Sequence, residues 1–190
     1  MNIVERVQNL LLAPKREWGV IAEEPATLQG LFTNYVMILA AIPAISNFIG
    51  YGVIGIADVR IPMSYAVMQL VITYALTLAG VYLLALLIDV LAAPFGGQKN
   101  FGMALKIAAY APTAAWLAGA FKMVPWLAIL SMVGGLYSLY TLYLGLPALM
   151  KTPENQSVAY IAVIVLAAIA MAVAVAVLQF LTIPPQMRGF

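Results

Sequence analysis

Long apolar runs separated by short polar segments dominate the sequence. Four runs contain no charged residue, and each exceeds the ~20 residues that a helix needs to cross a bilayer. A fifth run, Phe101–Phe121, is long enough but contains Lys106. The runs are continuous rather than alternating, which argues against the strands of an outer-membrane barrel. The uncharged runs are Ala26–Ala57, Ile61–Ile88, Met123–Met150 and Asn155–Met187.

We therefore predict an all-α fold, a polytopic bundle of five transmembrane helices, because each segment in lipid must satisfy its own backbone polar groups. Prolines stand near most of the expected helix ends. Pro43 and Pro112 fall inside expected helices, where each removes a backbone hydrogen bond and is expected to kink the helix. The predicted helices are Leu28–Tyr51, Ser64–Ala92, Phe101–Met123, Pro125–Met150 and Val158–Ile183.

The first 25 residues follow a different pattern, which divides the chain into residues 1–25 and a single membrane domain at 26–190. One helical face there is apolar, and Pro14 can open a second short helix. Arg6 and Glu17 are assigned to the polar, outward face. The pattern predicts an amphipathic segment lying at the membrane surface. A docking helix for a soluble partner is the alternative.

The composition supports a membrane protein and narrows its chemistry. Hydrophobic residues make up 65% of the chain and charged residues 8%, against about 25% charged in a typical soluble domain. The chain has neither Cys nor His, which removes the thiol nucleophile and the commonest general base. We predict no catalytic residue, cofactor or metal, and therefore a non-enzymatic protein. A net charge of +2 argues against a nucleic-acid partner.

The basic residues are distributed unevenly over the two predicted sides of the bundle. The positive-inside rule then places the N-terminus in the cytoplasm and the C-terminus outside. One side is expected to hold Arg6, Lys15, Arg16, Lys99, Lys106 and Lys151, and the other Arg60, Lys122 and Arg188.

Asp89 and Lys106 are the candidate polar pair, because charges within membrane helices are costly and often functional. They flank the short loop between the second and third predicted helices. A salt bridge that pins this hairpin is the preferred interpretation, and an ion or proton site is the alternative. Gly96 and Gly97 lie in the loop and predict a tight interhelical turn, since no phosphate-loop motif follows them.

Tyrosines and small residues recur at helical spacing. Tyr137, Tyr140 and Tyr143 are three residues apart on the fourth predicted helix, where they could bond to neighbouring helices or line a polar path. Small residues spaced by four on the second and fifth helices permit close contacts, either within the bundle or in a homo-oligomer.

Several short motifs, taken in order, resemble the Yip domain family, the polytopic Ypt/Rab-interacting membrane proteins. They comprise the family's bacterial opening, its junction between helices two and three, its internal proline motif and its tyrosine–glycine pattern. The matching residues are Pro14–Ile21, Asp89 with Phe95–Gly97 and Phe101, Tyr110–Pro112, and Tyr140 with Leu144, Gly145 and Leu146.

The resemblance implies five spans with the N-terminus inside. Eukaryotic members sit in Golgi and endoplasmic-reticulum membranes and bind small GTPases or shape vesicle traffic. This chain lacks their long polar cytosolic tail and their Asp-Leu-Tyr-Gly-Pro motif, which argues against a small-GTPase partner. It is more similar to bacterial members of the inner membrane.

Two functional hypotheses follow. The first is a membrane scaffold that binds itself or other proteins through small-residue helix faces and the N-terminal segment. The second is a small transporter or channel, with a polar path near Asp89, Lys106 and Tyr140. The lack of clustered polar residues at mid-membrane favours the scaffold.

Overall fold

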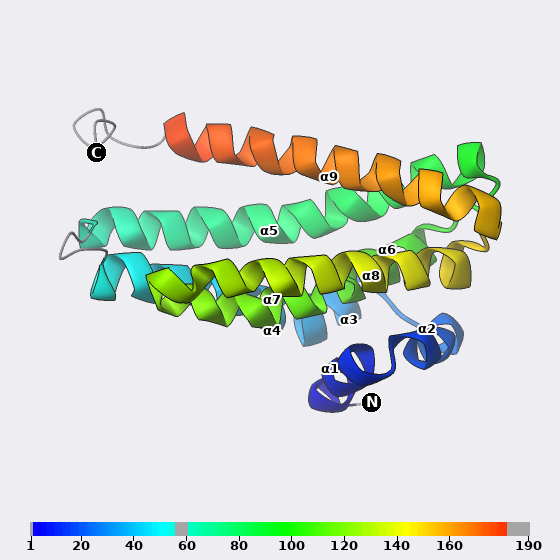
Figure 1. The fold of residues 1–190 in the computed structure, drawn as a ribbon, viewed down its shortest axis with the longest axis horizontal. Coiled ribbons are helices and arrows are strands. Elements are labelled where there is room, and N and C mark those ends of the chain that lie inside the picture. The colour runs from blue at the N-terminus through cyan, green and yellow to red at the C-terminus, as the bar shows by residue number, and fades with distance from the viewer. Residues whose placement is uncertain (1, 56–60, 182–190) are drawn as a thin grey trace.

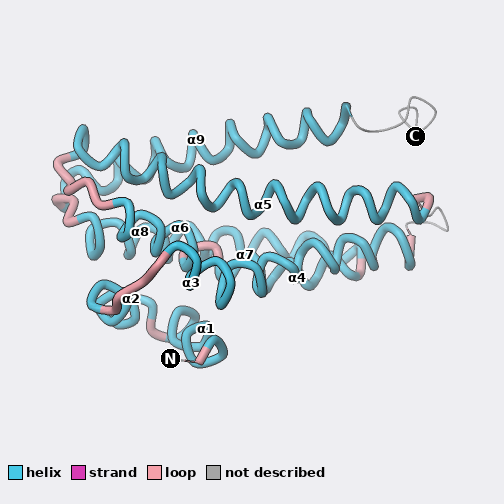
Figure 2. The backbone as a smooth tube through the Cα atoms, turned by 180° about the vertical axis from the view of Figure 1, so that it is seen from behind, coloured by secondary structure: helices cyan, strands magenta, loops and turns pink. Residues whose placement is uncertain are grey.

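The structure is a computed structural model that describes residues 2–55 and 61–181, and this part of the chain is helical without a strand. Long helices run past one another lengthwise, and a short helical hairpin packs against one side of them (Figures 1 and 2). The hairpin consists of α1 (Ile3–Leu12) and α2 (Pro14–Glu23). Asn2 caps α1 by accepting from the Val4 N–H, and Pro14 opens α2, where its missing N–H costs nothing.

The first pass along the bundle is one helical stretch that alternates between α-helical and π-helical pitch. Pro43 lies inside it, and the helix continues through this proline. Pro43 packs against Gly119, where an added Cβ would lie 2.6 Å from the proline Cβ. The stretch comprises α3 (Leu28–Leu31), the π-helical η1 (Phe32–Val36), α4 (Met37–Asn47) and the π-helical η2 (Phe48–Ile54).

Two further passes are long helices with apolar residues on every face. They are α5 (Met63–Ala92), extended by η3 (Ala93–Phe95), and α9 (Glu154–Leu181). Large apolar side chains such as Val71 and Leu166 remain exposed on them. A helix that is apolar all round suits lipid rather than water.

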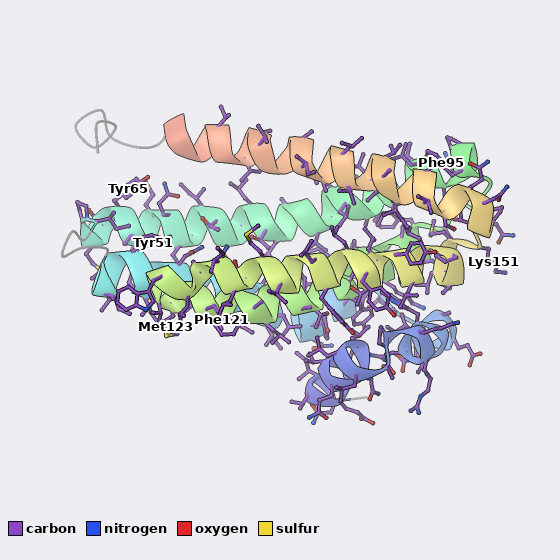
Figure 3. The ribbon with its side chains drawn as sticks, in the orientation of Figure 1. Tyr51, Tyr65, Phe95, Phe121, Met123 and Lys151 are labelled. Atoms are coloured by element: carbon purple, nitrogen blue, oxygen red, sulfur yellow. The ribbon has the colours of Figure 1, made fainter. Side chains whose placement is uncertain are left out.

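The third pass is broken. It comprises α6 (Phe101–Tyr110), α7 (Thr113–Ala118) and η4 (Gly119–Met123), with the interruption at Ala111 and Pro112. Pro112 cannot donate a backbone hydrogen bond and crowds the preceding turn. The segment still runs along the bundle, because Phe95 lies near one end and Met123 near the other (Figure 3).

The fourth pass is η5 (Pro125–Leu130) followed by α8 (Ser131–Met150). It lies very close to α7 at Gly134, where an added Cβ would fall 2.3 Å from the Ala118 Cβ and 2.5 Å from the Ala114 carbonyl oxygen. Only glycine permits this backbone approach.

Within the described residues, four helices are long and apolar enough to cross a membrane, so five unbroken spans are not confirmed. The predicted end of the last helix, Ile183, lies outside the described residues. The four spans are Leu28–Ile54, Met63–Phe95, Trp126–Met150 and Asn155–Val175.

Candidate functional site

A buried ion network holds the two helices of the N-terminal hairpin together and contacts the bundle at Tyr110. Arg6 of α1 is 4% exposed and forms ion pairs with Glu17 of α2, which is 2% exposed, and with Glu24. The Arg6 guanidinium also lies over the ring of Tyr110 in α6, 5.3 Å from its centroid, a cation–π geometry. The assignment of Arg6 and Glu17 to the outward face is therefore wrong: both point inward.

Lys106 secures the C-terminal end of the hairpin. Its ammonium donates to the carbonyls of Ile21, at 2.8 Å, and Glu24, at 2.6 Å. The last carbonyls of a helix have no intrahelical partner and carry partial negative charge. Lys106 from α6 therefore caps the C-terminus of α2.

The expected salt bridge between Asp89 and Lys106 does not form, which corrects the sequence interpretation. The ion pairs of the described residues involve Arg6, and Lys106 binds backbone carbonyls instead. Asp89 Oδ1 is buried without a hydrogen-bond partner within the described part of the chain. One residue earlier, the Ile88 carbonyl accepts a hydrogen bond from Tyr160 of α9.

Trp18 fixes α2 to α8. Its indole is fully buried and donates to the Thr141 carbonyl at 2.9 Å. The ring lies against Gly145, where an added Cβ would come within 2.8 Å of two indole carbons. One turn away, the Tyr137 hydroxyl donates to the Leu11 carbonyl at the end of α1 at 2.7 Å. Both hairpin helices are thus bonded to α8.

The break in the third pass supplies polar groups to the same region. The Tyr35 and Thr113 hydroxyls share a hydrogen bond of 2.7 Å, and Thr113 also donates to the Tyr110 carbonyl. Thr141 of α8 donates to the Ala111 carbonyl at 2.8 Å. Hydroxyls therefore satisfy carbonyls at the interruption beside Pro112, as polar side chains do at helix breaks in lipid.

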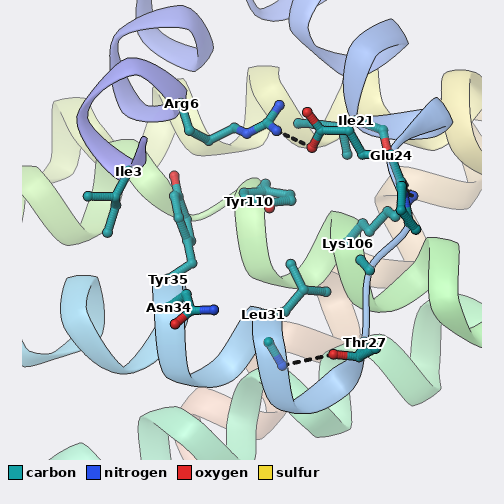
Figure 4. Close-up of a pocket in the computed structure, with 13 residues that line it drawn as sticks. Ile3, Arg6, Ile21, Glu24, Thr27, Leu31, Asn34, Tyr35, Lys106 and Tyr110 are labelled. Carbon is teal, nitrogen blue, oxygen red and sulfur yellow. Dashed lines mark hydrogen bonds and ion pairs between the residues drawn. The ribbon is translucent and has the colours of Figure 1, made fainter. Parts of the chain in front are cut away.

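A cavity of about 500 Å³ lies between the hairpin and the start of the first span. Figure 4 shows Arg6, Glu24, Lys106, Tyr35 and Tyr110 around it. Its lining combines the charged side chains of Arg6, Lys106 and Glu24 with polar and apolar residues.

The remaining candidate residues lie elsewhere. Tyr140 is 50% exposed on α8, and its ring packs edge-on against that of Tyr137. Neither Asp89 nor Tyr140 lines the cavity beside Lys106. The structure therefore does not join these three residues into one polar path.

Gly96 and Gly97 end the α5–η3 helix. Gly96 has a φ of +70°, in the left-handed region that glycine adopts at little cost. The Gly97 N–H donates to the Ala92 carbonyl at 2.9 Å. An added Cβ at Gly97 would lie 2.9 Å from Thr152 Oγ1, so this turn packs closely against the α8–α9 connection.

The sequence of the chain matches the family described as the Yip1 domain over residues 9–177. The chain belongs to the Yip1 family. It is 28% identical over 165 residues to the "Inner membrane protein YohC" of Escherichia coli strain K12, covering 83% of this chain and 85% of that protein. The same values hold for YohC of Escherichia coli O6:H1 strain CFT073. No solved structure matches the chain.

Several residues that carried the Yip resemblance meet where the hairpin docks. Trp18 packs on Gly145, and Tyr110 lies beneath Arg6. Arg6 and Glu17 were missed as members of this site, although their spacing contains the signal. Arg6 follows Ile3 by three and precedes Leu10 by four, so the three share one helical face.

Proposed function

We propose that this Yip1 family protein is a non-enzymatic scaffold of the inner membrane, which binds another membrane protein or a second copy through the outward face of its N-terminal hairpin. The main support for this proposal is that the two faces of the hairpin differ: one contacts the bundle and the other is exposed. Its inward face contacts the bundle through Arg6 on the Tyr110 ring, through Trp18 on the Thr141 carbonyl, and through the hydrogen bond that Lys106 donates to the Ile21 carbonyl. Its outward face leaves Leu12, 84% exposed, free for contact.

The exposed face combines apolar and basic side chains. Val20 is an exposed large apolar residue, and Lys15 and Arg16 are exposed as well. Such a face suits contact at the membrane surface, where both lipid headgroups and neighbouring proteins are within reach. Membership of the Yip1 family and the name of the YohC relatives support a role within the inner membrane.

For the topology, we propose that all five passes cross the membrane, with the N-terminus in the cytoplasm and the C-terminus outside. Lys151 lies at the same end of the bundle as Phe95, which precedes Lys99 by four residues (Figure 3). Two of the basic residues expected inside therefore lie at one end of the bundle, and the positive-inside rule makes that end cytoplasmic.

The chain has no Cys, so a single cysteine introduced as Gln98→Cys or Met63→Cys is the only thiol that can be labelled. An impermeant maleimide should label only Met63→Cys in intact cells; labelling of Gln98→Cys alone would contradict this orientation. Reporter fusions at both termini that report the same side would exclude five crossings.

Photocrosslinking tests the partner-binding face. A photoreactive amino acid at Val20 should give a discrete protein adduct in cells, whose mass distinguishes a second copy from another protein. The matched control is Val71, an exposed apolar residue on α5. Adducts at neither position, or equal adducts at both, would contradict a dedicated protein-binding face on the hairpin.

A further inference from the structure

The cavity beneath the hairpin contains more charge than an apolar packing defect would. Arg6 and Lys106 line it, and both are buried. Burying a charge is costly unless it is paired. Within the structure, Glu17 and Glu24 pair with Arg6, and carbonyls pair with Lys106.

Glu24 differs from the other members of this network. Its side chain is 40% exposed, whereas the Glu17 side chain is 2% exposed. It follows the end of α2 in the connection to α3 rather than lying within a helix. The Glu24 carboxylate can therefore leave Arg6 by a side-chain rotation, while Glu17 stays in place.

The charges of the network indicate what could replace Glu24. Arg6 and Lys106 together carry two positive charges, and Glu17 and Glu24 carry two negative charges. When Glu24 turns outward to water, the buried remainder has one positive charge in excess. A ligand with one negative charge restores neutrality in a site of reduced dielectric, where an unbalanced charge is most costly.

The remaining walls of the cavity suggest a lipid as the source of that charge. Ile3, Ile21 and Leu31 provide apolar surface beside the cations. The cavity lies at the start of the first candidate membrane span, Leu28–Ile54. In the proposed topology, this is the level at which the phosphate layer of a bilayer meets its hydrocarbon. A free anion would gain nothing from the apolar walls.

We propose that this cavity binds the phosphate group of an anionic phospholipid, which replaces the Glu24 carboxylate on Arg6 and is also attracted by the positive charge of Lys106. The site lies on the inward side of the hairpin. It therefore does not depend on the proposed protein-binding face.

Native mass spectrometry of the detergent-purified full chain tests this proposal. Phosphatidylglycerol and phosphatidylcholine are titrated in parallel, with inorganic phosphate as the third probe. We expect one phosphatidylglycerol to bind about tenfold more tightly than phosphatidylcholine, since a charge-assisted hydrogen bond contributes that much. Inorganic phosphate should not displace it.

The variants are chosen to act in opposite directions. Glu24→Gln should tighten phosphatidylglycerol binding several-fold, because it weakens the internal competitor for Arg6. Glu23→Gln is the matched control, with the same charge change at an exposed neighbour outside this cavity, and should leave binding unchanged. Lys106→Gln should weaken binding about tenfold, whereas exposed Lys15→Gln should not.

Misfolding cannot produce the tightening expected of Glu24→Gln, so that variant decides the outcome. Equal affinities for the Glu24→Gln and Glu23→Gln variants would overturn the replacement of Glu24. Equal affinities for phosphatidylglycerol and phosphatidylcholine would overturn recognition of the anionic lipid. Displacement of the lipid by inorganic phosphate at equal concentration would overturn the lipid as the source of the phosphate.

Discussion

Substitution of Gly145 by alanine should loosen the docked hairpin. The new Cβ would lie 2.8 Å from two carbons of the Trp18 ring, where ordinary contact is 3.4–4 Å. The indole cannot retreat freely, because its N–H is bonded to the Thr141 carbonyl. Overpacking costs about 1–3 kcal/mol, and we expect about 2–3 kcal/mol of that range here because the indole is held in place; the gain in helix propensity returns about 1 kcal/mol. The expected net loss in docking free energy is about 1–2 kcal/mol.

The opening of the hairpin can be measured by thiol labelling. Leu10 is buried in a core cluster that the hairpin shares with the bundle, and the chain has no Cys. The labelling rate of Leu10→Cys therefore reports the fraction of molecules with an open hairpin. Gly145→Ala should raise this rate about tenfold, which corresponds to about 1.4 kcal/mol. Gly135→Ala is the matched control on the same helix, because its added Cβ meets nothing within 4 Å.

The double variant identifies the cause. In a Trp18→Ala background the overlap is absent, so adding Gly145→Ala should not speed labelling further. Equal acceleration with and without Trp18 would refute the steric reasoning. So would a Gly145→Ala variant that labels no faster than Gly135→Ala.

Three further substitutions test the network and the helix contacts. Arg6→Ala should cost about 3–5 kcal/mol in docking free energy by leaving Glu17 buried and unpaired, whereas Arg16→Ala on the exposed face should change the labelling rate little. Asp89→Asn and Lys106→Gln share no bond, so their effects on unfolding in detergent should add to within about 0.5 kcal/mol; a larger coupling would show that they interact. Gly134→Val should lower the stability of the bundle by more than about 1 kcal/mol, since it would overlap Ala118 and the Ala114 carbonyl; an unchanged unfolding midpoint would contradict this packing.

The positions of the long helices could largely be predicted from the sequence. In lipid the backbone polar groups must be satisfied within the segment, so a long apolar run predicts a helix. α5 begins one residue from its predicted start at Ser64, and α8 ends at the predicted Met150. The third helix was harder to place. Pro112 predicted a kink, but whether a proline bends or interrupts a helix depends on what satisfies the freed carbonyls, here Thr141 and Thr113 from tertiary contacts.

The docking site could be predicted only in part. Trp18 was assigned to the inward face by its apolar character, whereas Arg6 and Glu17 were assigned outward because they are charged. Glu17 nevertheless precedes Ile21 by four residues, which places it on the buried face. The partner of a buried charge lies in another element, so helical periodicity can show that a charged residue faces inward but not what neutralises it.

The buried charges are better explained by orientation than by stability. Replacing a buried ion pair with apolar residues is often neutral or stabilising. We therefore expect Arg6→Met combined with Glu17→Leu to leave the unfolding midpoint near that of the parent protein. The hairpin should nevertheless lose its single orientation, because apolar contacts are non-directional. Spin labels at exposed Lys15→Cys and Lys151→Cys should then show a broad distance distribution in the double variant and a narrow one in the parent. A narrow distribution in both would show that Trp18 and Lys106 suffice to orient the hairpin.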